Sequence, residues 1–124
     1  MAGLVLVVDD DESTRFVVAE ALGDDGYEVV QAADGIGALA LLADWRPDLI
    51  VLDLLMPEMD GWAFTAAYQQ MAPPHAPVLL LTVVTVYTAG GVAGRPLPPA
   101  AGTLAKPFDL EALLALVRQF ASPN

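Results

Sequence analysis

Short runs of consecutive aliphatic residues that end in polar residues constrain the fold of this 124-residue chain more than any other feature. The first run, Leu4–Val8, leads directly into Asp9 and Asp10, and the run Leu49–Leu52 leads into Asp53. An unbroken aliphatic run of this length indicates a strand that is buried on both faces, as the strands of parallel sheets are. The sequence therefore predicts a parallel sheet that carries carboxylates at the ends of two strands.

Helical patterns separate the predicted strands. Five strands are expected, over Leu4–Val8, Tyr27–Ala32, Leu49–Leu52, Val78–Thr82 and Thr103–Ala105. Apolar residues between and after them recur at helical spacing, and the sets expected to face inward are Thr14, Val17, Val18, Ala21 and Leu22, then Ala38, Leu39 and Leu42, then Phe64, Ala67, Tyr68 and Met71, and finally Leu110, Leu113, Leu114 and Val117. Asp11, Asp34, Asp60 and Asp109 are expected to cap these helices. This alternation predicts an α/β fold, a flavodoxin-like doubly wound parallel sheet with strand order 2-1-3-4-5.

Polar side chains that follow the strands are expected to meet in one crevice, because the carboxyl ends of parallel strands lie on the same edge of the sheet. They are Asp9, Asp10, Asp53, Thr82 and Lys106, the only lysine of the chain. Three neighbouring carboxylates repel one another, and a hard divalent cation such as Mg²⁺ relieves that repulsion. An aspartate can also accept a phosphoryl group as a nucleophile, with a lysine neutralising the transferred charge. If Asp9, Asp10 and Asp53 were only three unrelated strand-end caps, the positions of Thr82 and Lys106 would be unexplained.

Composition narrows the function classes further. The absence of cysteine excludes disulfides and thiol chemistry. A net charge of −11 argues against direct binding to nucleic acid. The aliphatic runs are too short to cross a membrane, and the first residues carry no base of the kind that starts a secretory signal. We expect one domain over residues 1–124, in the cytoplasm and without membrane contact.

Four segments together resemble the receiver domains of bacterial response regulators: Val7–Asp11, Asp53–Gly61, Leu81-Thr82 and Lys106–Phe108. The resemblance extends over roughly residues 3 to 121. It implies that Asp53 accepts a phosphoryl group from a phosphohistidine on a sensor histidine kinase or a histidine phosphotransfer protein. It also implies that phosphorylation switches the binding of a downstream protein target.

The resemblance further implies how Mg²⁺ is held. Asp10 and Asp53 would bind the ion, Asp9 would act through a water, and the backbone carbonyl of Leu55 would be the third protein ligand. Apart from its own phosphorylation and dephosphorylation, no catalytic activity is expected.

Two residues are implied to contact the phosphoryl group. Lys106 would pair with it, and the peptide bond from Lys106 to Pro107 would be cis. Thr82 would turn inward on phosphorylation. The family often couples this threonine to an aromatic residue, whose position is occupied here by Thr103, and Tyr87 is a candidate substitute.

Residues 83–100 depart from the family, which has its fourth helix there. This stretch contains three glycines and three prolines and begins with β-branched residues. Each glycine costs a helix about 1 kcal/mol and each interior proline about 3 kcal/mol. We predict that the fourth helix is short, irregular or missing.

Two apolar residues, Leu55 and Val84, occupy positions that flank the path of the hydrolytic water in the family. Apolar side chains should exclude or misplace that water. We predict that the phosphorylated protein loses its phosphoryl group slowly.

Two other functions compete with the phosphorylated switch. A receiver-like module that binds or dimerises without being phosphorylated would fit the unusual segment 83–100, and a homodimer stays possible in either case. A phosphatase of the haloacid-dehalogenase class would also form an aspartyl phosphate, but it usually carries a second Asp where this chain has Leu55.

A chain without an effector domain would act by binding a partner or by passing phosphate onward, whereas a longer protein could carry an effector.

Overall fold

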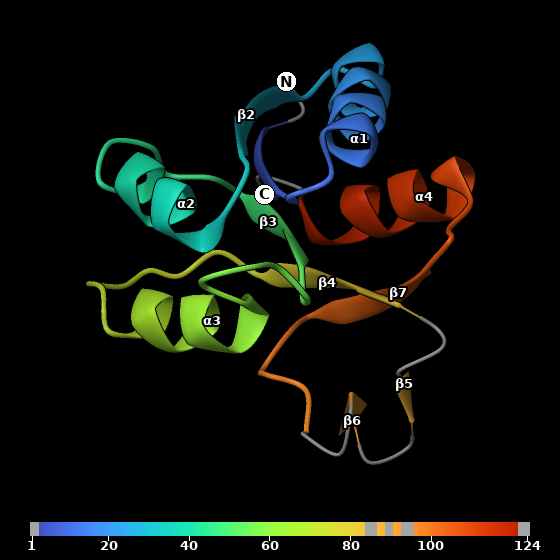
Figure 1. Ribbon diagram of the computed structural model, residues 1–124. Coiled ribbons are helices and arrows are strands. Elements are labelled where there is room, and N and C mark those ends of the chain that lie inside the picture. The colour runs from blue at the N-terminus through green and yellow to red at the C-terminus, as the bar shows by residue number, and fades with distance from the viewer. Residues whose placement is uncertain (1–2, 84–86, 89–90, 93–95, 122–124) are drawn as a thin grey trace.

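The computed structural model describes residues 3–83, 87–88, 91–92 and 96–121. In these ranges four helices and seven strands follow one another (Figure 1). In chain order they are β1 (Leu4–Val8), α1 (Glu12–Asp24), β2 (Glu28–Ala32), α2 (Gly35–Leu42), β3 (Leu49–Asp53), α3 (Gly61–Gln69), β4 (Val78–Val83), β5 (Tyr87–Thr88), β6 (Gly91–Val92), β7 (Gly102–Lys106) and α4 (Leu110–Phe120).

A five-stranded parallel sheet forms the centre of the molecule, in the order β2-β1-β3-β4-β7. Counting only its own strands along the chain, this is the predicted order 2-1-3-4-5. Helices α2 and α3 cover one face of the sheet, and α1 and α4 cover the other (Figure 1). The predicted flavodoxin-like fold is confirmed.

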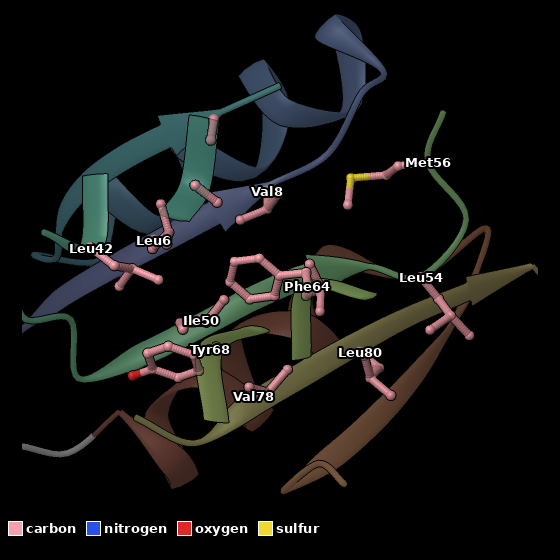
Figure 2. Packing of buried hydrophobic residues seen from close by; sticks show 13 residues of the cluster. Leu6, Val8, Leu42, Ile50, Leu54, Met56, Phe64, Tyr68, Val78 and Leu80 are labelled. Carbon is pink, nitrogen blue, oxygen red and sulfur yellow. The ribbon is translucent and has the colours of Figure 1, made fainter. Parts of the chain in front are cut away.

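The central strands are buried on both faces, which explains their unbroken aliphatic sequences. Alternate residues of one strand enter opposite clusters: Leu6 and Val8 of β1 face the α2–α3 side, and Val5 and Val7 face the α1–α4 side. On the α2–α3 side Phe64 lies at the centre of the cluster, fully buried (Figure 2). This two-sided packing fixes strand β1, and with it the position of Asp9 at its end.

Aspartates cap all four helices as predicted. The carboxylates of Asp11, Asp34, Asp60 and Asp109 accept hydrogen bonds from backbone N–H groups in the first turns of α1, α2, α3 and α4. These caps satisfy donors that have no partner within the helix, so they fix where each helix begins.

Two expectations about helix faces are wrong. Val17 was expected to face inward from α1, but 45% of its surface is exposed, and only Val18 and Leu22 of that helix are buried. The inward stripe is narrower because α1 lies along an edge of the sheet beside α4. Met71 lies beyond the end of α3 at Gln69, although it still packs against the α2–α3 cluster.

No helix lies between β4 and β7 in the part of the chain that the structure describes. Strands β5 and β6 pair there as a short antiparallel hairpin, and residues 96–101 that follow have no regular structure. The predicted loss of the fourth helix is therefore confirmed for these residues. Among the described helices, none is long and apolar enough to span a bilayer.

Candidate functional site

The five predicted polar residues converge at the carboxyl edge of the sheet. Asp9 follows β1, Asp53 ends β3, Thr82 lies near the end of β4, and Lys106 ends β7. Asp9, Asp53 and Thr82 are almost completely buried, whereas Asp10 is exposed. The strand register therefore collects these side chains in one place, open to solvent on the side of Asp10.

Lys106 connects two of the carboxylates. Its Nζ lies 2.9 Å from Oδ2 of Asp9 and 3.5 Å from Oδ2 of Asp53. The first distance is that of a charge-assisted hydrogen bond, and the second is a looser ion pair. Burial alone would lower the pKa of the ammonium group, but the hydrogen bond to Asp9 and the charge of Asp53 outweigh it and raise the pKa of Lys106.

The carboxyl group of Asp53 is crowded by negative charge. Burial and the neighbouring charge of Asp9 raise the pKa of Asp53 to about 7, even though Lys106 acts in the opposite direction. A hydrogen bond that the protonated Asp53 donates to the side chain of Asp10 also raises the pKa, in the same direction as burial. One lysine is thus not enough to neutralise three carboxylates, and the site favours an additional positive charge.

The donor set fits a hard divalent cation. Asp9, Asp10 and Asp53 each offer a carboxylate oxygen, and these oxygens all lie within 4.8 Å of one another. Oxygen ligands of this kind, with one side open to water, suit Mg²⁺, which keeps several waters when it binds to proteins. Receiver domains bind Mg²⁺ at such an acidic cluster.

The loop after Asp53 is held by a close approach of two backbones. The N–H of Gly61 donates to the carbonyl of Leu54 over 2.8 Å, which closes the loop onto the start of α3. A Cβ at position 61 would lie 2.9 Å from Cα and 2.7 Å from Cδ1 of Leu54, so no larger residue fits there. Within the loop, Glu58 has a positive φ of 66°.

Arg15 was not predicted from the sequence but contributes to the site. Its guanidinium donates a hydrogen bond of 2.8 Å to the backbone carbonyl of Asp9, and the carboxylate of Asp9 accepts one of 2.9 Å from the N–H of Asp11. Both contacts orient Asp9. The sequence indicates this role of Arg15 only through its position, four residues after the cap Asp11 in the first part of the helix that follows Asp9.

Other predicted residues have mixed outcomes. The peptide bond between Lys106 and Pro107 is cis, as predicted. Leu55, two residues after Asp53, is 40% exposed, and Thr103 is exposed on β7. Val84 lies outside the described residues, and of Tyr87 only its place in β5 is described. The roles expected for Leu55, Val84 and Tyr87 stay predictions.

Comparison with known proteins identifies the family of the chain. The response regulator receiver domain family matches residues 5–118. The response regulator MprA of Mycobacterium sp. (strain KMS) is 41% identical over 117 residues, which cover 92% of this chain and 48% of that protein. MprA of Mycobacterium bovis (strain BCG / Pasteur 1173P2) is 40% identical over 121 residues, which cover 95% of this chain and 50% of that protein.

Solved structures give the same result. The chemotaxis response regulator CheY4 of Vibrio cholerae superposes with a TM-score of 0.82 at 37% identity, covering 97% of this chain and 99% of that one. The signal receiver domain of a signal transduction histidine kinase from Syntrophus aciditrophicus gives a TM-score of 0.85 at 30% identity. The match covers 97% of this chain and 90% of that one.

The fold and the site define a receiver domain of two-component signalling. The chain belongs to the response regulator receiver domain family. It spans about half the length of the curated relatives that it matches.

Proposed function

We propose that this chain is a phosphorylation-dependent switch in which Asp53 is the phosphoacceptor. The observation that carries the proposal is the position of the Lys106 ammonium, within 3.5 Å of a buried Asp53 carboxylate that also borders Asp9 and Asp10. A lone structural lysine would need only one carboxylate partner. This lysine contacts two, Asp9 and Asp53, and a phosphoryl group on Asp53 would add further negative charge for it to neutralise.

The transfer is a displacement at phosphorus. An oxygen of the ionised Asp53 carboxylate attacks the phosphorus of a phosphohistidine, a P–O bond forms, and the P–N bond breaks with the electron pair leaving on the imidazole. Lys106 stabilises negative charge on the phosphoryl oxygens because its ammonium group is already held in place by Asp9. The product is an acyl phosphate on Asp53.

Mg²⁺ would be held by Asp9, Asp10 and Asp53, with the backbone carbonyl of Leu55 proposed as a further ligand, and would neutralise charge on the phosphoryl group. Its binding would also lower the proton affinity of Asp53, since a cation beside a carboxylate favours the charged form. The same ligands thereby keep the nucleophile ionised. Thr82, almost fully buried on β4, is proposed to donate a hydrogen bond to a phosphoryl oxygen.

The partners follow from this chemistry. The phosphodonor is proposed to be a sensor histidine kinase or a histidine phosphotransfer protein, and the output is proposed to be altered binding of a downstream protein. For this chain itself we propose no direct contact with nucleic acid, in keeping with its charge of −11, and a location in the cytoplasm.

Acetyl phosphate, a small phosphodonor, tests the proposal without a cognate kinase. Intact-mass spectrometry of the protein incubated with acetyl phosphate and Mg²⁺ should show one added phosphoryl group, and the addition should disappear with EDTA and in Asp53→Asn. An unphosphorylated binding module would show no addition in any sample. Continuous release of inorganic phosphate in excess over the protein would point to a phosphatase instead.

A further inference from the structure

A second groove lies on α3, away from the acidic site. One wall is a single stripe of the helix, with residues at spacings of three and four: Trp62, Thr65, Ala66 and Gln69. The opposite wall is the segment Pro96–Pro99, which we call the proline strip. In Figure 1 the strip belongs to the orange stretch that leads into β7.

A specific hydrogen bond joins the two walls. The indole Nε1 of Trp62 donates to the backbone carbonyl of Pro96 over 2.7 Å, and Leu97 packs against the α2–α3 core cluster. An aromatic groove that bonds the carbonyls of an extended proline-rich segment is a general mode of peptide recognition, because such segments lose little entropy on binding. The α3 stripe already makes one such bond, from Trp62 to a proline-rich segment of its own chain.

The proline strip fills the groove only in part. A cavity of about 390 Å³ remains between the strip and α3. Thr65 lines this groove and is only 3% exposed, yet its hydroxyl oxygen has no hydrogen-bond partner among the described residues. A buried hydroxyl without a partner is uncommon, so the groove lacks a polar group that a better-fitting occupant would supply.

Charge restricts what that occupant can be. None of the eight lining residues that the structure describes is charged, although the whole chain carries a net charge of −11. An uncharged peptide loses no solvation of ionic groups in such a groove, and the net negative charge of the chain does not repel it.

We propose that the α3 stripe is a docking site for an uncharged, proline-rich segment of a partner protein, and that the proline strip occupies it until the partner displaces it. The peptide would accept a hydrogen bond from Trp62 and exchange one with Thr65. The proposal does not depend on phosphorylation of Asp53, so either can fail without the other.

A capped synthetic peptide containing Pro-Leu-Pro-Pro twice is the probe. All titrations use a Trp45→Phe background, which leaves Trp62 as the only indole, and follow its N–H signal by NMR. In a loosened variant, Leu97→Ser with Pro98→Gly and Pro99→Gly, the peptide should shift this signal saturably. Binding to the chain with its intact strip should be about ten-fold weaker or more, because a tethered competitor acts at roughly millimolar effective concentration.

Matched controls separate docking from nonspecific contact. The same peptide with every proline replaced by alanine should not bind, and Thr65→Val should weaken binding several-fold while the fold, judged by NMR dispersion, is retained. No saturable shift in a folded loosened variant, or equal shifts with the alanine peptide, would overturn the proposal. So would a concentration-dependent dimer of the loosened variant in which a second copy protects the indole without any peptide.

Discussion

Lys106 and Asp53 lie 3.5 Å apart, Nζ to Oδ2, although strand β4 separates the two strands that carry them. The lysine reaches across the end of β4 and also bonds Asp9 at 2.9 Å. One ammonium group therefore contacts the carboxylate of Asp53 on the central strand β3 and that of Asp9 after β1. Strand β1 lies beyond β3 as seen from β7, which carries the lysine.

Lys106→Met should destabilise the protein without Mg²⁺ at pH 8. The substitution keeps most of the apolar stem but removes the one ion-pair partner that Asp9 and Asp53 have among the described residues. Because the lysine side chain is 20% exposed, we expect a loss of about 1–3 kcal/mol in the free energy of unfolding, below the range for a fully buried pair. Urea denaturation measures it, and saturating Mg²⁺ should reduce the difference.

Arg46→Met is the matched control for that experiment. Arg46 is exposed and has no ion pair with any described residue, so its loss should change stability by less than about 0.5 kcal/mol. Equal effects of the two substitutions would show that Lys106 does not neutralise buried carboxylates.

The raised pKa of Asp53 makes the stability of the metal-free protein depend on pH. The folded carboxyl titrates at about 7 and the unfolded one near its ordinary value of 3.8, so between these values the folded state holds a proton that the unfolded state has lost. The contribution of Asp53 to the free energy of unfolding is therefore full below pH 3.8 and declines as the pH rises towards 7. Urea unfolding of the wild type should lose stability over this window more steeply than Asp53→Asn, and parallel curves would contradict the assignment.

Gly61→Ala should destabilise the loop after Asp53. Its new Cβ would lie 2.9 Å from Cα of Leu54, a backbone atom that cannot move aside cheaply. Strain of this kind costs about 1–3 kcal/mol. Thermal unfolding checks it against Gly23→Ala, whose Cβ would meet nothing within 4 Å and should leave stability unchanged or slightly higher.

The acyl phosphate should be long-lived, because the residue two positions after Asp53 is the apolar and partly exposed Leu55. Replacing it with a residue that can hold a water, Leu55→Asn, should shorten the lifetime several-fold. The rate at which purified phosphoprotein releases phosphate after removal of the donor is measured for the wild type and for Leu55→Asn. Ile36→Asn, a change at another exposed apolar residue, is the control and should leave this rate unchanged. A wild-type lifetime of seconds would contradict the prediction.

Much of the fold could be predicted because its strands have local signatures. Runs such as Leu4–Val8 are aliphatic since both of their faces are buried, and the acids that end them mark the edge where the site forms. The exposure of Val17 could not be predicted, because helical spacing shows which residues share a face but not how wide the contact with the sheet is.

Contacts between segments that lie far apart in the chain could not be predicted from the sequence either. The bond from Arg15 to the Asp9 carbonyl depends on how α1 meets the sheet, and the bond from Trp62 to Pro96 joins residues 34 positions apart. The prolines and glycines of residues 83–100 predicted the loss of a helix, since they oppose one locally. They did not predict the hairpin of β5 and β6, nor that the proline strip packs on α3.

Chemical trapping of the phosphorylated residue tests the central claim most directly. Borohydride reduces an aspartyl phosphate to homoserine, and peptide mass spectrometry then identifies the modified position. After incubation with acetyl phosphate and Mg²⁺, we predict homoserine at position 53 and at no other aspartate, and none without Mg²⁺. Homoserine at Asp9 or Asp10, or its absence everywhere, would contradict the assignment of Asp53 as the phosphoacceptor.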